Sequence, residues 1–383
     1  MKNRLLKIIG ILSLSFMICS TMAVSSGIPE IMKAFSNCSL ASLEFLMSSP
    51  TISILIMIAL TPLLSRYLKE STMICTGLVI IGTAGTLPFF FQSYPVMFCS
   101  RIVLGIGIGL LNTYAVTLVG EHFSGELRQR LQGIRCSIET LGEASLIFIA
   151  GRLLVLGWAY SYLIYLIAFI ILFLYLCFVP KEMPQQAKVE EKTLCRDMSL
   201  GEKKIACADA GLGFLLVATL TAMAMRTPSF LVDAGFGDAV QASTVLSLSI
   251  ISGFFGGIVF GKLLTHMRRL LLPAALLCIG TGLCIVAFAG NLLMIGLGAC
   301  LFGFFATIGL SYMFNSLSDS LPSEVLTAGN AAVLVGCNLG AASSPFQLQF
   351  FSLIHDSLAF GYLCYAFIFF TIAIILLVYK LKK

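Results

Sequence analysis

The chain has 383 residues, of which 58% are hydrophobic and only 11% are charged, and its formal net charge is +6. A soluble domain carries roughly 25% charged residues, so this composition excludes an ordinary soluble fold. A net positive charge would suit a nucleic-acid binder, but the basic residues here lie in short clusters between apolar runs. We therefore expect a membrane protein that binds no nucleic acid.

Twelve apolar runs organise the sequence, six on each side of a charged segment at residues 181–204. Each run is roughly 20 residues or longer, the length that a helix needs to cross about 30 Å of hydrocarbon. Only helices can cross lipid this many times in one chain, because lipid offers no partner for an unpaired backbone N–H or C=O. The predicted spans are 5–28, 43–64, 72–91, 96–118, 131–153, 158–179, 205–226, 240–261, 270–289, 292–315, 325–350 and 358–379.

The predicted fold is therefore all-α and integral to the membrane, with 12 transmembrane helices in two six-helix halves, an organisation typical of transporters. The halves are residues 1–180 and 205–383, and the segment 181–204 is the predicted cytoplasmic linker. With the N-terminus inside, twenty of the 24 Lys and Arg residues fall in or beside predicted cytoplasmic segments. This positive-inside bias predicts a multi-pass protein of the plasma membrane with both termini in the cytoplasm.

The first run has a basic start and an apolar stretch, so it would also fit a cleaved signal peptide. Cleavage would leave eleven spans and break the symmetry of the two halves. We therefore interpret residues 5–28 as the first span.

Two similar segments follow the second and the eighth spans, two hundred residues apart. They are Thr61-Pro-Leu-Leu-Ser-Arg66-Tyr-Leu-Lys69 and Gly261-Lys-Leu-Leu-Thr-His-Met-Arg-Arg269. Both resemble in part the signature loop of the major facilitator superfamily, Gly-x-x-x-Asp-Arg-x-Gly-Arg-Arg. Arg66 stands at the motif arginine in the first half, and Gly261 and Arg269 match in the second. The acidic position is lost in both, so the charge relay that the family has at this loop is weakened.

The fourth span contains Arg101-Ile-Val-Leu-Gly105-Ile-Gly107-Ile-Gly109, which resembles the Arg-x-x-x-Gly-x-Gly pattern of the same superfamily. Gly105 and Gly109 form a small-x-x-x-small face that allows a second helix to approach closely. Arg101 lies five residues into the span, roughly 8 Å from its outer boundary. It would either snorkel to the outer headgroups or face the central cavity, where it would pair with a carboxylate or attract an anionic substrate.

The fifth span supplies the carboxylates. Arg135, Glu139 and Glu143 stand four residues apart and therefore lie along one helical face. Glu143 is roughly 15 Å from the outer end, near the midplane, where an acid rarely faces lipid. One hypothesis is that Glu143, together with Glu139 and Arg101, exchanges the driving proton. The alternative is a static Arg135–Glu139 ion pair beside a neutral, hydrogen-bonded Glu143.

The fifth span also contains a motif that bears on the direction of transport. Antiporters of the superfamily carry Gly-x8-Gly-Pro-x-x-Gly-Gly there, and Gly133 and Gly142 have that spacing, but Glu143 replaces the proline. Segments flanking spans 1 and 6 resemble bacterial drug-type proton antiporters: Gly27-Ile-Pro-Glu-Ile31, Gly157-Trp-Ala-Tyr and Phe178-Val-Pro-Lys-Glu182. This likeness implies proton-coupled export of small amphipathic compounds.

Polar residues inside other spans are candidates for the wall of a substrate cavity. Asp209 and Arg226 lie near the ends of the seventh span, and we interpret them as boundary residues. Asn330 and Asn338 share a face of the eleventh span with several glycines, so this face either lines the pathway or packs against another helix. The cavity candidates are Arg135, Asn112, Tyr312, Asn330 and Asn338.

No enzyme motif competes with transport. There is no Gly-x4-Gly-Lys-[Ser/Thr] loop, the three histidines lie at three different span boundaries, and no cysteine pair has CxxC spacing. We expect no metal and no cofactor, and we interpret the cysteines as small buried hydrophobic residues. The expected partners are a small-molecule substrate, protons and the bilayer, and the expected state is a monomer.

Three functions remain open. The first is a secondary transporter that exports amphipathic compounds against protons. The second is proton-coupled uptake of a small organic anion, because Arg101 would attract a carboxylate. The third is a membrane sensor of transporter fold that binds without net transport.

Overall fold

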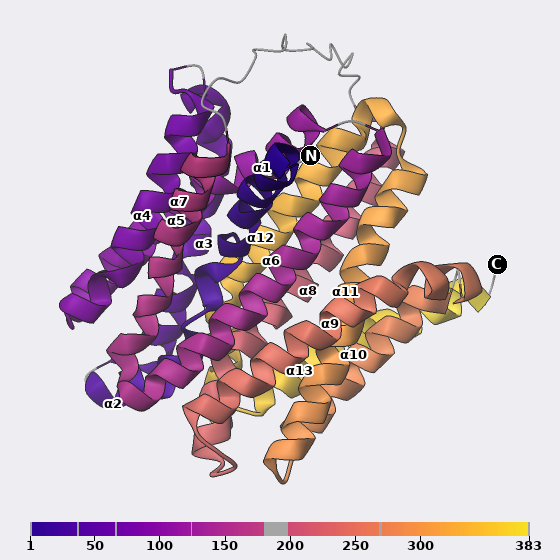
Figure 1. Ribbon diagram of the computed structural model, residues 1–383. Coiled ribbons are helices and arrows are strands. Elements are labelled where there is room, and N and C mark those ends of the chain that lie inside the picture. The colour runs from indigo at the N-terminus through magenta and orange to yellow at the C-terminus, as the bar shows by residue number, and fades with distance from the viewer. Residues whose placement is uncertain are drawn as a thin grey trace. The chain divides into compact units, whose positions relative to one another are not determined.

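The computed structural model describes residues 2–36, 38–65, 67–123, 125–179, 198–267 and 270–381, and every regular element in these ranges is a helix (Figure 1). The chain divides into two compact units. The first unit holds the helices up to α7 together with Asp238–Ser247, and the second holds α8, the rest of α9 and the helices that follow.

The helices of the first unit follow the six predicted runs. Two of them contain short 3-10 stretches, labelled η, before or between the α-helical parts. The elements are α1 (Lys2–Ser13), η1 (Leu14–Met17), η2 (Ser20–Met22), η3 (Ser25–Gly27), α2 (Ile28–Ala34), α3 (Leu40–Leu64), α4 (Glu70–Phe90), α5 (Tyr94–His122), α6 (Gly125–Leu153), η4 (Leu154–Leu156), η5 (Trp158–Leu166) and α7 (Ile167–Phe178).

The second unit begins at a capping box. The side chain of Ser199 accepts from the backbone N–H of Glu202, and the Glu202 carboxylate accepts from the N–H of Ser199, so two of the unpaired donors at the start of α8 are satisfied. The elements are α8 (Leu200–Asp233), α9 (Ala239–Met267), α10 (Leu271–Ala287), α11 (Leu292–Ser320), α12 (Ser323–Ile354) and α13 (Phe360–Leu381).

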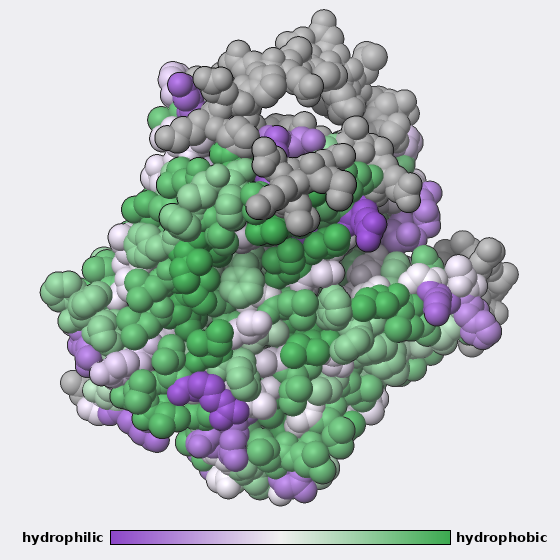
Figure 2. All heavy atoms as spheres, in the orientation of Figure 1, coloured by the Kyte–Doolittle hydropathy of each residue, from purple (hydrophilic) through white to green (hydrophobic). Residues whose placement is uncertain are grey.

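The length and apolar character of these helices confirm the predicted class of membrane protein. In the described ranges, eight helices are long and apolar enough to cross a bilayer, and a bent pair at the N-terminus makes a ninth span. The helix α10 is apolar but has only 17 residues. The helix α6 has 29 residues but carries Arg135, Glu139 and Glu143 in its middle, which lowers its apolar character. On the face drawn in Figure 2, hydrophobic residues cover most of the helices.

The first predicted span is not one continuous helix. Residues Leu6–Met17 and Ser20–Ala34 meet at a bend of 47°, and 3-10 turns replace the α-helix between Leu14 and Gly27. The prediction of a single helix over 5–28 was therefore wrong in detail. The run contains several serines, whose hydroxyls offer the backbone local hydrogen bonds and weaken helical propensity.

Glycines allow close helix contacts at corresponding places in the two units. A Cβ on Gly107 of α5 would lie 2.9 Å from the carbonyl oxygen of Gly77 in α4. In the second unit a Cβ on Gly298 of α11 would lie 2.8 Å from the carbonyl oxygen of Gly282 in α10. Both pairs join the third and fourth spans of their half, so the two halves repeat this contact.

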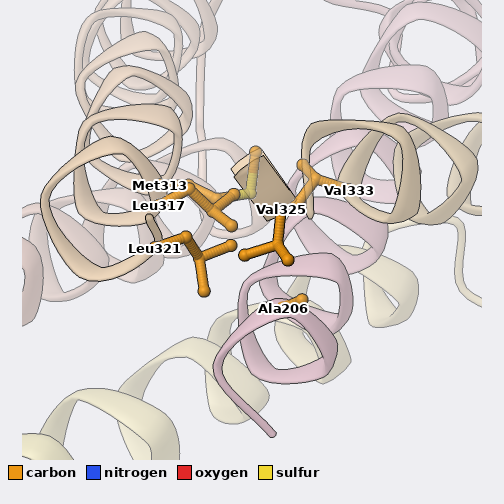
Figure 3. Packing of buried hydrophobic residues seen from close by; sticks show 6 residues of the cluster. All are labelled: Ala206, Met313, Leu317, Leu321, Val325 and Val333. Carbon is orange, nitrogen blue, oxygen red and sulfur yellow. The ribbon is translucent and has the colours of Figure 1, made fainter. Parts of the chain in front are cut away.

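The core of the second unit includes a cluster from α8, α11 and α12, which Figure 3 shows. Met313 and Leu317 of α11 meet Val325 and Val333 of α12, with Leu321 at the turn and Ala206 of α8 below. All six residues are at most 5% exposed. The small Ala206 allows α8 to approach the larger side chains, and this contact fixes the start of α8 against the other two helices.

Candidate functional site

At the bend of the first span, side chains from other helices donate to backbone carbonyls, one of which, that of Ser20, also accepts from the N–H of Ala23 at 3.2 Å. The carbonyl oxygen of Ser20 accepts from the hydroxyl of Tyr165 in η5 at 3.0 Å, and that of Thr21 accepts from Nη1 of Arg101 at 3.3 Å. The same Nη1 donates to the Tyr165 hydroxyl oxygen at 2.9 Å. Arg101 and Tyr165 therefore act together as a clamp on the bend.

Arg101 is completely buried, so it does not snorkel to a headgroup region. Its guanidinium carbon lies 5.3 Å from the ring centroid of Tyr162 and 6.0 Å from that of Tyr165, within cation–π range. Its Nη2 contacts the sulfur of Met47 at 3.2 Å. Within the described ranges these are its contacts, and the expected carboxylate partner is not among them.

The charged face of α6 reaches the bend from another side. Nη1 of Arg135 lies 2.8 Å from Oε2 of Glu139, and the thiol of Cys19 donates to Oε1 of the same carboxylate at 3.4 Å. The Arg135–Glu139 pair is partly buried, with side-chain exposures of 13% and 24%. Cys19, Ser20 and Thr21 thus place the bend between Glu139 on α6 and the clamp from α5 and η5.

Glu143 lies one turn beyond Glu139 and is partly buried. It is within electrostatic range of Glu139 and Cys19, and it forms no hydrogen bond or ion pair with any described residue. The preceding Gly142 brings α6 against η1, since a Cβ there would lie 2.8 Å from the carbonyl oxygen of Phe16. The glycine therefore holds Glu143 close to the bend.

The glycines of the α5 pattern lie against α3 and α4. A Cβ on Gly105 would collide with the carbonyl oxygen of Pro50, and one on Gly109 would lie 2.5 Å from Cβ of Met57. Gly107 faces α4 on the opposite side. By contrast Gly261, at the end of α9, is exposed with open space around it. Arg66 and Arg269 lie outside the described residues.

The remaining polar candidates do not converge on the bend. Asn112, in the second half of α5, and Asn330 are partly buried, and Nδ2 of Asn338 donates to the carbonyl of Leu334 in its own helix at 2.8 Å. Tyr312 lines a groove of about 500 Å³ in the second unit together with Asn315 and Asp319. Nδ2 of Asn315 donates to Oδ2 of Asp319 at 2.9 Å.

Two residues interpreted from sequence as boundary residues are at least partly buried. Arg226 is only 3% exposed and donates to the hydroxyl of Ser352 at 3.3 Å. Oδ2 of Asp209 is buried without a hydrogen-bond partner among the described residues. The prediction that the cysteines are buried was wrong: of the twelve described cysteines, all of them free, eight are partly exposed, and Cys99, Cys136, Cys177 and Cys207 are exposed.

Sequence reasoning missed Cys19, Tyr162 and Tyr165. A usable signal existed, because Tyr-x-x-Tyr occurs in the sixth run at residues 162–165 and again in the twelfth run at residues 362–365. All four tyrosines are fully buried. In the second unit, Tyr362 shares a hydrogen bond with Thr227 of α8 at 3.0 Å, so the last span of each half contacts the first.

Comparison with known proteins decides the family. The family model described as Major Facilitator Superfamily matches residues 10–345. The chain belongs to the Major Facilitator Superfamily. None of the curated proteins matches the chain.

Solved structures of the superfamily share the fold at low sequence identity. A POT family transporter in complex with 5-aminolevulinic acid has a TM-score of 0.80 at 12% identity, covering 99% of this chain and 96% of that one. A D-xylose-proton symporter has a TM-score of 0.72 at 17% identity, covering 97% and 96%. The nucleoside transporter NupG has a TM-score of 0.72 at 15% identity, covering 98% and 99%. Membership of this superfamily makes the protein a multi-pass membrane transporter and not an enzyme.

Proposed function

We propose that this superfamily member is a proton-coupled secondary transporter that exports small amphipathic compounds by alternating access. The observation that carries the proposal is the arrangement at the bend of the first span. Glu139 is held on both oxygens, by Arg135 and Cys19, whereas Glu143 one turn away forms no hydrogen bond or ion pair with a described residue. A carboxyl group without a fixed partner is free to take up and release a proton when its surroundings change.

The bent segment of the first span is the part of the structure beside Glu143 that can change conformation. A bent, 3-10 segment has weaker backbone hydrogen bonding than an α-helix, so it is the natural hinge of the first span. Cys19 links this segment to Glu139, and Tyr165 links it to Arg101. In the proposed cycle, protonation of Glu143 changes the balance of charge beside the hinge and favours one of two arrangements.

Arg101 positions the hinge in this scheme. It was proposed from sequence as a coupling residue that would bind a carboxylate, but its guanidinium is enclosed by Tyr162, Tyr165 and Met47. Uptake of an organic anion depended on Arg101 being available to that anion, so burial weakens this alternative. The drug-type antiporter likeness of the segments around spans 1 and 6 favours export.

The remaining proposals concern the setting. The positive-inside bias supports a location in the plasma membrane with both termini in the cytoplasm. We further propose that the chain has two halves, 1–180 and 205–383, joined by a cytoplasmic linker at 181–204. The proposed substrate-facing residues are Asn112 in the first half and Tyr312, Asn330 and Asn338 in the second. We expect the monomer to be the working unit.

Flux into vesicles tests the proposed function. A host strain lacking its own exporters would express the protein and be grown against a panel of toxic amphipathic dyes. A dye to which the strain becomes resistant would then be followed into proteoliposomes with an imposed pH gradient. Proton-driven dye transport that collapses when the gradient is removed supports exchange. Dye binding without flux in either direction would instead identify a sensor.

A further inference from the structure

The helix α9 is shared by the two units of the chain. Its first part, Asp238–Ser247, belongs to the first unit, and the remainder belongs to the second. The hydroxyl of Ser247 donates to the backbone carbonyl of Ala144 in α6 at 2.9 Å. Both residues are only 3% exposed. This buried hydrogen bond therefore joins α9 to α6 one residue beyond Glu143.

Glu143 lies between two packed faces of α6. Gly142 faces the first span, where a Cβ would lie 2.8 Å from the carbonyl oxygen of Phe16. Gly151 faces α9, where a Cβ would collide with the hydroxyl of Ser243. Successive residues of a helix are about 100° apart, so these two glycines point in opposite directions and Glu143 lies roughly midway between them. The turn of α6 that contains Glu143 is therefore held from both sides, by the first span and by α9.

Further along the chain, α9 is fixed to α11. The hydroxyl of Ser249 donates to the carbonyl of Ala299 at 2.6 Å. The hydroxyl of Ser252 donates to the carbonyl of Cys300 at 2.9 Å. One continuous helix thus contacts α6 at its beginning and, further along, contacts α11, which contains the proposed substrate-facing residue Tyr312.

The beginning of α9 brings no charge to Glu143. In the described chain, the groups that interact with Glu143 electrostatically are Glu139, which is paired with Arg135, and Cys19 of the first span. Residues 239–253 of α9 include no titratable side chain. The helix α9 therefore acts on Glu143 through the position of α6, which decides whether water reaches the carboxyl group.

We propose that Ser247 is a positioning residue for Glu143, an inference that rests on the proposed proton coupling. Its hydrogen bond to Ala144 holds the turn of α6 against α9, and breaking this bond frees the turn to expose Glu143 to water. Because α9 is fixed to α11, a movement of these two helices makes or breaks the bond. Proton binding in the first half is thereby linked to substrate contacts in the second.

Hydrogen–deuterium exchange of the purified full chain tests the contact without transport. Ser247→Ala should raise amide exchange at residues 144–148 about two- to tenfold, the effect of one lost buried hydrogen bond on local opening. Ser247→Thr retains the hydroxyl and should exchange at the wild-type rate. The matched control is Ser252→Ala, which removes a bond of the same length from the same helix but to α11, and should leave exchange in α6 unchanged.

Dye flux in proteoliposomes distinguishes positioning from a purely structural role. In Ser247→Ala, the pH of half-maximal gradient-driven flux should move by about 0.3–1 unit, the same two- to tenfold effect on a pH scale. Ser247→Thr should restore the wild-type profile, and Ser252→Ala should keep it even where the rate falls. In a Glu143→Gln background, Ser247→Ala should change gradient-driven flux no further, because the group that it positions can no longer ionise.

Two results overturn the inference. One is equal exchange at residues 144–148 in Ser247→Ala and the wild type. The other is an unchanged pH profile in Ser247→Ala beside an active wild type, which would make the bond structural only. A wild type without gradient-driven flux would instead refute the proposed function itself.

Discussion

At the scale of single residues, Glu139 and Glu143 differ although they stand one turn apart on the same helix. Both oxygens of Glu139 have partners, an arginine at 2.8 Å and a thiol at 3.4 Å, so its negative charge is stabilised in place. Glu143 has only electrostatic neighbours in the described chain. Desolvation without a partner disfavours a charge, so of these two carboxyl groups Glu143 is the one that breaks no hydrogen bond or ion pair when it takes up a proton.

The first prediction follows from this difference. Glu143→Gln keeps size and hydrogen bonding but cannot ionise, so dye flux driven by a pH gradient should fall at least about a hundredfold, the low end of the range for a lost proton-transfer group. Gradient-free exchange of the same dye should survive. Parallel flux assays in proteoliposomes at equal protein density measure both quantities.

Glu139→Gln is the comparison for this variant. It should reduce flux less, because the single carbonyl oxygen of Gln can still accept from Arg135, although the bond from Cys19 is lost. If Glu143→Gln matches wild type in gradient-driven flux, Glu143 is structural and coupling lies elsewhere.

The second prediction concerns the clamp on the bend. Tyr165→Phe removes the bonds to Ser20 and Arg101 and should destabilise the protein by about 1–2 kcal/mol. Arg101→Lys keeps the charge but loses the Nη2 contact with Met47 and the planar group that lies over Tyr162 and Tyr165, so it should cost a similar amount. Because both act on one bend, the double variant should lose less than the sum of the two.

Thermal or denaturant melting of the four proteins in detergent gives this coupling energy, which we expect to be roughly 0.5–3 kcal/mol. Strict additivity would show that Arg101 and Tyr165 support the fold separately.

At the scale of elements, α5 is fixed by glycines on two faces. Gly105 and Gly109 meet α3, and Gly107 meets α4. The sequence predicted the face formed by Gly105 and Gly109, because small residues four positions apart can be recognised within one helix. The contact of Gly107 was not predicted, since it depends on which helix lies on the other side.

The third prediction is that Gly109→Leu reduces the yield of folded protein or traps one conformation. Leu at this position would overlap Met57 and force α3 away, and overpacking of this kind costs about 1–3 kcal/mol. Gly211→Leu in α8 is the matched control, because a side chain there meets open space. Fluorescence-detected size exclusion reports folded yield for both. Normal yield and transport in Gly109→Leu would show that α3 accommodates the larger residue.

The bend in the first span and the partners of Arg101 mark the limit of sequence reasoning. Helix length follows from hydrophobic run length, so eleven of the spans were predicted within a few residues at most ends. The bend depends on whether distant residues satisfy its carbonyls, and Tyr165 is 145 residues from Ser20. Periodicity along one helix carries no information on such a contact. Arg135 and Glu139 were predictable because they are neighbours on one helix.

At the scale of the whole molecule, the two halves repeat contacts as well as helices. Gly77–Gly107 corresponds to Gly282–Gly298, and the two buried tyrosine pairs stand two hundred residues apart. Such repetition is expected of a transporter that is built from two structural repeats. The halves differ in charge, because the Arg135–Glu139–Glu143 face lies in the first half alone, whereas three of the four proposed substrate-facing residues lie in the second half.

The fourth prediction concerns topology. In a variant without native cysteines, Lys192→Cys in the linker should resist an impermeant maleimide added to intact cells, and should react after the membrane is permeabilised. Gly290→Cys, between α10 and α11, should react from outside, because the predicted topology places that turn on the opposite surface. Ready labelling of the Lys192→Cys variant in intact cells contradicts cytoplasmic termini.

The distant partners of the bend also set an order of assembly during synthesis. When the first span leaves the ribosome, Arg101 and Tyr165 have not yet been made, 80 and 145 residues downstream of the carbonyls they bind. Lipid cannot substitute for them. The clamp of Arg101 and Tyr165 on the bend can therefore be completed only after the sixth span has been made. A nascent chain released before residue 101 would leave the Thr21 carbonyl without its Arg101 donor, and one released before residue 165 would leave the Ser20 carbonyl with only its local bond from Ala23.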